Sequence, residues 1–287
     1  MYIWVYYVAM GISPVTIKLM HLLYIQGINS GFFNKVFRQY GRDMSRVFSY
    51  FGLDRKVEKC SRLDRIIYQL KRDNLRVLNL TDRQYPELLK NIALVPPLLF
   101  LKGRPITDNF KIAVVGTRKP SDYGKKVAAN LGRQLSRAGI TVVSGMAKGI
   151  DGCAQQASLA GKGGSIGVLG NGIGYTYPRS NFRLFGEIVE NGCLVSEYLP
   201  LSKPRKKNFV YRNRIISGLA NGVVVIESAE KGGALITANF AAEQGREVFA
   251  VPGNIYSRTS RGTNNLIQKG AKLVSSIDSI VEEFNYI

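Results

Sequence analysis

From residue 111 onward, the chain alternates between short apolar runs rich in valine and isoleucine and longer segments with helical spacing. The runs predict strands at Ile112–Val115, Thr141–Val143, Ser165–Leu169, Cys193–Val195, Val223–Ile226 and Val248–Val251. The intervening segments predict helices at Tyr123–Arg137, Gly152–Leu159, Ser180–Glu190, Arg212–Leu219, Ala234–Gln244 and Asn264–Lys269. Apolar strands separated by helices are typical of a parallel sheet covered on both faces. We therefore expect an α/β fold with an extended Rossmann-like, doubly wound and mostly parallel sheet.

The part of the chain before this alternation has a different pattern. Apolar residues recur at helical spacing through residues 13–69, which predicts a small all-α (SAM-like) domain over residues 1–72. Residues 73–108 form a connecting segment with short strand candidates at Leu75–Leu80 and Leu98–Lys102. The Rossmann-like domain is then expected over residues 109–287.

Glycines and polar residues follow the predicted strands again and again, at the edge where ligands bind in such sheets. Glycine lets backbone N–H groups approach an oxyanion, and a following helix adds the positive end of its dipole. Five such loops favour a phosphate site, although any one alone could be a plain turn. The candidate phosphate-binding residues are Gly116, Thr117, Arg118, Lys119, Ser144, Gly145, Lys148, Gly149, Asn171, Asn213, Arg214, Gly232, Gly233 and Arg261.

A basic segment before the fourth predicted helix of this domain adds a second indication. Residues 203–214 contain six Lys or Arg residues, no acid, and the aromatic residues Phe209 and Tyr211. Cations that follow a phosphate backbone, interleaved with rings that stack on bases, are what single-stranded nucleic acid needs. A solvated basic loop remains the alternative for this segment taken alone.

The charge balance extends this pattern to the whole chain. Lys and Arg total 40 against 20 Asp and Glu, a formal net charge of +20. Residues 1–105 and 106–287 each carry about half of that excess, which indicates basic surfaces on folded domains rather than a basic tail. Such a field favours polyanions, although solubility could also account for a basic surface.

The sequence lacks the residues that several classes of protein require. There is no Gly-x-Gly-x-x-Gly motif and no acid closing the second strand, so NAD binding is disfavoured. No Ser-His-Asp arrangement, metal-ligand cluster or Walker A sequence occurs, and His21, the single histidine, lies in the helical part. We expect no catalytic residue, metal or cofactor, although Glu227, Glu230 and Glu243 could in principle serve as acid/base groups.

The cellular compartment is indicated by cysteine usage and by the chain start. Cys60, Cys153 and Cys193 are few and widely spaced, which favours a reducing compartment over a disulfide framework. The apolar start at Met1–Ile12 lacks preceding basic residues and is too short to span a bilayer. We expect a cytoplasmic protein without membrane insertion.

The ordered motifs resemble those of the DNA-processing protein A family (DprA, also called Smf). The motifs are Ala113-Val114-Val115-Gly116-Thr117-Arg118, Val143-Ser144-Gly145-Met146-Ala147-Lys148-Gly149-Ile150-Asp151, Tyr177-Pro178, Arg212-Asn213-Arg214, Gly233-Ala234-Leu235-Ile236-Thr237-Ala238, Gln244-Gly245-Arg246-Glu247 and Gly262-Thr263-Asn264. The resemblance covers roughly residues 75–280 in register.

This resemblance implies a non-enzymatic protein that binds incoming single-stranded DNA during natural transformation, protects it and helps to load the RecA recombinase. It implies a homodimer, with Leu266–Leu273 as the region of the dimer surface, and a DNA pocket at Arg118 and Lys148. Many family members continue into a C-terminal winged-helix domain, which we do not expect in this chain.

The competing hypothesis is a nucleotide-binding protein or an enzyme similar to the nucleoside monophosphate phosphoribohydrolases. The Lys231-Gly232-Gly233 loop resembles the Pro-Gly-Gly-x-Gly-Thr loop of those enzymes. Here Lys231 replaces the proline, and Thr237 falls at the wrong spacing.

Overall fold

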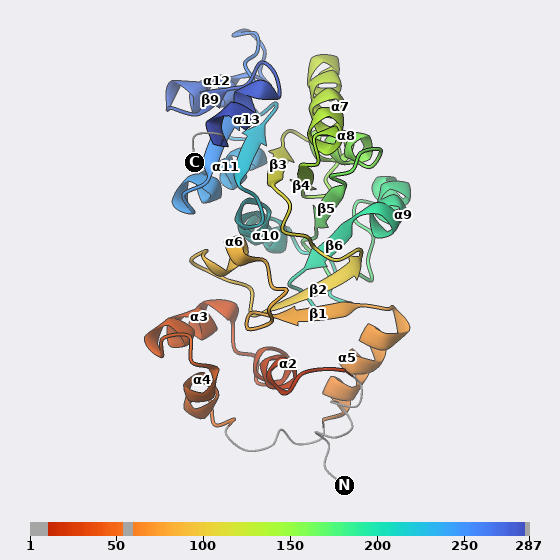
Figure 1. The fold of residues 1–287 in the computed structure, drawn as a ribbon, viewed down its shortest axis with the longest axis vertical. Coiled ribbons are helices and arrows are strands. Elements are labelled where there is room, and N and C mark those ends of the chain that lie inside the picture. Colours follow the sequence, from red (N-terminus) through yellow and green to blue (C-terminus); the bar gives the residue numbers. More distant parts are fainter. Residues whose placement is uncertain (1–10, 54–59, 285–287) are drawn as a thin grey trace.

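The computed structural model describes residues 11–53 and 60–284, in which a small helical part adjoins a large sheet with helices on both sides (Figure 1). Within these residues the sheet has nine strands, in the order β1-β2-β6-β5-β4-β3-β7-β8-β9. Their bounds are β1 Arg76–Asn79, β2 Leu98–Gly103, β3 Lys111–Val115, β4 Thr141–Ser144, β5 Ser165–Val168, β6 Cys193–Ser196, β7 Gly222–Val225, β8 Glu247–Ala250 and β9 Lys272–Leu273. Only the pairings of β2 with β1 and with β6 are antiparallel. The predicted mostly parallel α/β fold is confirmed.

In the helical part, polar side chains cap the N-termini of short helices. Its elements are α2 Pro14–Met20, the π-helical turn η1 His21–Ile25, α3 Ser30–Gln39, α4 Met44–Tyr50 and α5 Ser61–Arg72. The Ser13 hydroxyl accepts from the Thr16 N–H at 3.2 Å, and the Asn29 amide oxygen accepts from the Phe32 N–H at 2.8 Å. Buried apolar side chains such as Phe33 join these helices to the core beneath the sheet. Most of the apolar start of the chain lies outside the described residues.

The segment predicted to connect the two parts belongs to the sheet. Strand β2 pairs antiparallel with β1 on one side and with β6 on the other. The short helix α6 Glu87–Lys90 lies between β1 and β2. Residues 76–103 therefore extend the parallel sheet by two strands and place the helical part against its edge (Figure 1).

Helices cover both faces of the sheet, as the parallel crossovers require. Helices α7 Asp122–Arg137, α8 Ile150–Ser158 and α9 Phe182–Asn191 carry the chain from β3 to β6 in one direction. Helices α10 Lys206–Gly218, α11 Gly233–Glu243 and α12 Arg261–Gln268 carry it from β6 to β9 in the other. Right-handed crossovers in opposite directions place the two sets on opposite faces. The 3-10 turn η2 Arg179–Asn181 precedes α9, and α13 Asp278–Phe284 ends the described chain.

Strand β3 lies at the switch point of the sheet, where the chain stops adding strands on one side and starts adding them on the other. Its neighbours are β4 on one side and β7 on the other, both parallel to it. Its side chains alternate between two cores: Ile112 and Val114 in one, Ala113 and Val115 in the other. Because the chain leaves β4 and β7 toward opposite faces, a crevice opens beyond the carboxyl end of β3.

One helix differs from its prediction in a way that matters for the site. Helix α10 begins at Lys206, six residues before the predicted start at Arg212. The basic and aromatic segment is thus the first two turns of a helix rather than a loop.

Candidate nucleic-acid interface

A cavity of about 390 Å³ occupies the crevice at the carboxyl end of β3. Loops after β3, β4 and β7 line it, together with α10 and the start of α11. Its lining residues are Val115, Gly116, Thr117, Arg118, Ala147, Asp151, Phe209, Val210, Arg212, Asn213, Ile216, Ser228, Ala229, Gly232, Gly233, Ala234, Ile236 and Thr237. The predicted convergence of glycine loops thus holds for three of the five.

The loop after β3 is held rigidly and presents Arg118 to the cavity. The Thr117 N–H donates to the Glu227 carbonyl at 2.8 Å, and the Thr117 carbonyl accepts from the Ile150 N–H at 3.2 Å. A Cβ added at Gly116 would lie 2.5 Å from Ile150, so only glycine fits there. The Arg118 side chain is exposed and makes no hydrogen bond or ion pair within the described chain, so its donors are available to a ligand.

The start of α11 faces the same cavity from the other side. Gly232 is the N-cap residue and provides no side chain to satisfy the first N–H groups of this 11-residue helix. Unsatisfied N–H groups at a helix start, with the positive end of the helix dipole, favour an anion. Arg118 and the start of α11 therefore face one cavity whose donors and positive charge suit an anion.

A second cavity, of about 110 Å³, adjoins the first and adds aromatic rings. Arg118, Ala147, Phe209 and Arg212 line both cavities, whereas Lys148 and Tyr177 line only the second. The ring centroids of Tyr177 and Phe209 are 5.1 Å apart, at 42°. Tyr177 is 43% exposed, and Lys148 is exposed without a protein partner in the described chain. The exposed cations Arg118 and Lys148 thus lie beside the Tyr177 and Phe209 ring pair, which we call the aromatic slot.

Arg212 is the buried cation behind both cavities. Only 4% of it is exposed, and its guanidinium donates to the Gly145 carbonyl at 3.0 Å and to the Val168 carbonyl. Burial lowers the pKa of Arg212 to about 10, with the nearby Asp151 carboxylate acting in the opposite direction. Arg212 therefore stays charged at neutral pH and fixes the ends of β4 and β5.

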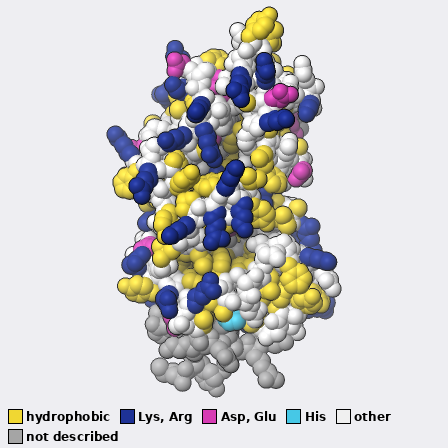
Figure 2. Space-filling model, turned by 180° about the vertical axis from the view of Figure 1, so that it is seen from behind, with side chains coloured by type: hydrophobic (Ala, Val, Ile, Leu, Met, Phe, Trp, Pro, Cys, Tyr) yellow, Lys and Arg dark blue, Asp and Glu magenta, His cyan; other side chains and the backbone are white. Residues whose placement is uncertain are grey.

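Among the residues that the structure describes, Asp151 is the single acid that lines either cavity. It accepts the Gly145 N–H at 3.1 Å. Burial raises its pKa, while Arg212 and these hydrogen bonds oppose the rise. The charge that lines the two cavities is therefore positive overall. On the face of the molecule seen from behind, Lys and Arg side chains also gather around apolar surface at mid-height (Figure 2).

Helix α10 separates the predicted site residues into two groups. Phe209, Arg212, Asn213 and Ile216, at spacing i, i+3, i+4 and i+7, face the first cavity. Arg214 lies on the other flank, 1% exposed, with its guanidinium on the Glu197 carboxylate at 2.6 and 2.7 Å. Two further donations, to the Leu94 and Tyr211 carbonyls, complete its environment. Arg214 therefore does not reach the cavity, which corrects its predicted place among the phosphate-binding residues.

Other predicted residues support the site without facing it. The Ser144 hydroxyl is buried and donates to the Val114 carbonyl at 2.7 Å. The Asn171 amide is buried and donates to the Gly172 and Tyr175 carbonyls at 2.9 and 2.7 Å. Gly149 has a φ of +83°, and an added Cβ would lie 2.4 Å from the Thr117 carbonyl oxygen.

The remaining predicted residues differ in reach. Gly232, Gly233 and Asn213 line the first cavity, and Gly145 lines the second. Lys119 and Arg261 are exposed but line neither. The prediction also missed Tyr177 and Arg212 as site residues, although both stand in the quoted motifs.

The three glutamates considered as acid/base groups do not gather at the cavities. The Glu227 carboxylate accepts from the Ser121 N–H at 2.9 Å, its hydroxyl at 2.5 Å and the Thr259 hydroxyl at 3.0 Å. Glu230 and Glu243 are exposed and line neither cavity, and Glu243 ends α11, about 15 Å along the helix from Gly233. Among residues 11–53 and 60–284, no group of three His, Cys, Asp or Glu residues could hold a metal ion.

The fold and the site together define an α/β protein with a cation-lined crevice at the switch point of its sheet, the place where ligands bind in such folds. The chain belongs to the DNA recombination-mediator protein A family, whose model matches residues 76–285. It is similar to the DNA processing protein DprA of Bacillus subtilis, at 43% identity over 224 residues, which are 77% of this chain and 75% of that protein. The resemblance expected from the motifs is confirmed.

Two solved structures extend the comparison to the fold. The structure of DNA processing protein A from Streptococcus pneumoniae matches with a TM-score of 0.73 and 35% identity, covering 90% of this chain and 98% of that one. The protein from Helicobacter pylori, described for its single-stranded DNA binding mode, matches with a TM-score of 0.66 and 28% identity, covering 75% and 98%. No helix in the described ranges is both long and apolar enough to cross a membrane.

Proposed function

We propose that this protein binds single-stranded DNA in the cytoplasm during natural transformation, protects the strand and helps to load the RecA recombinase onto it. The observation that carries the proposal is the pair of adjoining cavities, with Arg118 on both and the Tyr177 and Phe209 rings beside it. A strand can place its phosphates against Arg118, Lys148 and the start of α11, and a base against the rings. The single-stranded DNA binding of the Helicobacter pylori relative supports this reading.

The first experiment measures affinity for single-stranded and double-stranded DNA of one sequence across a range of salt concentrations. We expect tighter binding of the single strand, because its bases are free to stack on the aromatic slot. The logarithm of the binding constant should fall with the logarithm of salt concentration, by about 0.7 for each phosphate contact. Equal affinity for the two forms would contradict the proposal.

The aromatic slot gives a prediction of its own. Tyr177→Ala should weaken binding of single-stranded DNA by about 1–3 kcal/mol, the value typical of one lost base stack, with little change in the salt slope. Fluorescence anisotropy with a labelled oligonucleotide would measure both quantities. The matched control is Tyr68→Ala, which removes an exposed ring from α5 in the helical part. Equal effects of the two variants would rule out stacking at Tyr177.

The proposal includes a homodimer through the region Leu266–Leu273. Leu273 is 44% exposed on the edge strand β9, and Ile255 and Tyr256 expose 72% and 87% on the loop before α12. Apolar groups of this size at a sheet edge favour contact with a second copy. Sedimentation velocity at micromolar concentration would show a monomer if this part of the proposal fails.

We also propose that the site is not catalytic. Glu227 is fully engaged by Ser121 and Thr259, and the one acid at the cavities, Asp151, is buried beside Arg212. Neither carboxylate is therefore placed to transfer a proton to a bound nucleotide. Incubation with nucleoside monophosphates, followed by chromatography for released base, tests this, and base release would favour the phosphoribohydrolase hypothesis.

A further inference from the structure

A larger groove lies on the other flank of α10, where the helical part meets the sheet. Its volume is about 910 Å³, at the upper end of the range for ligand pockets. Tyr24 and Ile28 line it from the helical part, and Tyr198, Lys207 and Tyr211 line it from the sheet domain. We refer to it as the tyrosine groove.

The tyrosine groove adjoins the phosphate site through the first turns of α10. Val210, 46% exposed, lines both the tyrosine groove and the first cavity. Phe209 and Arg212 face the first cavity, whereas Lys207 and Tyr211 face the groove. An extended ligand that leaves the first cavity over Val210 therefore enters the groove directly.

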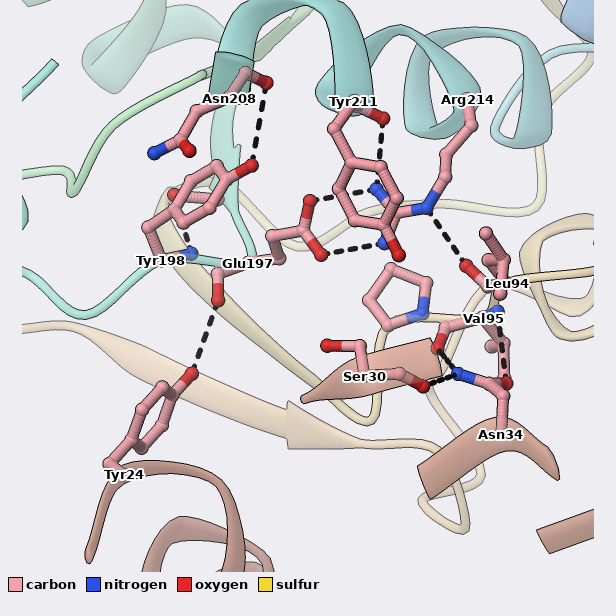
Figure 3. A network of polar contacts seen from close by, with 12 residues as sticks. Tyr24, Ser30, Asn34, Leu94, Val95, Glu197, Tyr198, Asn208, Tyr211 and Arg214 are labelled. Carbon is pink, nitrogen blue, oxygen red and sulfur yellow. Dashed lines mark hydrogen bonds and ion pairs between the residues drawn. The ribbon is translucent and has the colours of Figure 1, made fainter. Parts of the chain in front are cut away.

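Two of the tyrosines that line the groove have hydroxyls that are already engaged. The Tyr24 hydroxyl donates to the Glu197 carbonyl at 3.1 Å, and the Tyr198 hydroxyl donates to the Asn208 carbonyl at 3.4 Å (Figure 3). The Tyr211 ring has the Arg214 guanidinium 3.8 Å from its centroid. Partly exposed rings with satisfied hydroxyls offer apolar contact rather than hydrogen bonds to a ligand.

The charges around the groove favour an anionic ligand. Within the described ranges, the one carboxylate that lines it is Glu197, which is held by Arg214 through two short bonds and is 7% exposed, so it presents no free negative charge. At the rim, Lys207 is exposed, and the neighbouring cations Lys203, Arg205 and Lys206 are exposed as well. A ligand with phosphates at the cationic rim and flat apolar rings within the groove matches this distribution of charge.

We propose that the tyrosine groove is a second subsite for the same DNA strand, which crosses the first turns of α10 and stacks bases between the helical part and the sheet. This inference rests on the proposed function of the first site. The helical part then contributes one wall of the DNA path. A basic peptide is disfavoured, because the described residues that line the groove offer no free carboxylate and its polar rim is cationic.

The test compares oligothymidylates of increasing length, from about 4 to about 16 nucleotides. For the unmodified protein we expect an added rise in affinity, at least about fivefold, once the strand is long enough to reach the groove. Ile28→Asp places a negative charge on the groove wall of the helical part, and Lys207→Ala removes a cation at the rim. Both should abolish the added rise and leave the affinity for the shortest binding oligonucleotide unchanged.

The matched control is Tyr68→Asp, which adds the same charge to an exposed position on α5 outside the groove. It should keep the full length dependence. Unchanged length dependence in both Ile28→Asp and Lys207→Ala would overturn the subsite, even if short oligonucleotides bind normally. Failure of the unmodified protein to bind any oligonucleotide would instead overturn the proposed function, and the subsite with it.

Discussion

Replacing Arg118 by alanine is expected to weaken binding of single-stranded DNA about 10- to 100-fold. A hydrogen bond between charged groups contributes about 1.5–3 kcal/mol, and Arg118 lines both cavities without a protein partner in the described chain. The slope of log affinity against log salt should fall by about 0.7 for each lost phosphate contact. Anisotropy titrations at several salt concentrations measure both effects.

The structure supplies a matched control for this variant. Arg137 is an exposed arginine in the last turn of α7, and it lines neither cavity. Arg137→Ala removes the same charge from the whole protein but no cavity contact. If both variants weaken binding equally, the effect comes from net charge, and the site does not lie at Arg118. The melting temperature of both should stay near that of the unmodified protein, because neither side chain is buried.

The strand pattern predicted the sheet well because buried parallel strands have a simple signature. Each of the six predicted strands in residues 111–287 lies within two residues of an observed strand, as with Ile112–Val115 and β3. Strand β9, only two residues long, has too few apolar positions to produce such a signal. Pairing order is a tertiary property, so the addition of β1 and β2 through β6 did not follow from the local pattern.

The candidate site was predicted less completely, and α10 explains why. The dense basic residues before Arg212 are typical of a solvated loop, and this pattern hides the helical spacing of α10. Because α10 begins at Lys206, helical periodicity places Phe209, Arg212 and Asn213 on one flank. It places Arg214 on the other. Charge alone does not distinguish an arginine that binds phosphate from one that holds a buried carboxylate.

The glycine loops show the same limit. Glycine at Gly116 and Gly149 is required by close packing within the protein, at Ile150 and at the Thr117 carbonyl, so these glycines shape the site. At Gly233 an added Cβ would meet nothing within 4 Å. This residue is the first of α11 and faces the cavity. The sequence contains the same residue type for both uses, and only the neighbours that the fold brings in separate them.

Removing the carboxylate partner of Arg214 is expected to lower the stability of the protein more than any of the DNA-binding variants does. Glu197→Ala should lower the free energy of unfolding by about 3–5 kcal/mol, because it leaves a buried cation without its partner. Burial acts to lower the pKa of Arg214, and the attraction of Glu197 outweighs it and raises that pKa. The melting temperature should fall by roughly 10 °C in a calorimetric or circular dichroism scan.

A surface pair of the same chemistry provides the control. The Arg183 and Glu187 side chains form an ion pair at 2.8 Å in α9, with Arg183 91% exposed, so Glu187→Ala should cost only about 0–1 kcal/mol. The double variant Glu197→Leu with Arg214→Met should regain much of the lost stability, since neither charge is then buried alone. Below its melting transition Glu197→Ala should keep the salt slope measured with the shortest binding oligonucleotide, because neither member of the pair lines the first two cavities. A melting temperature within about 2 °C of the unmodified protein would show that Arg214 does not depend on Glu197.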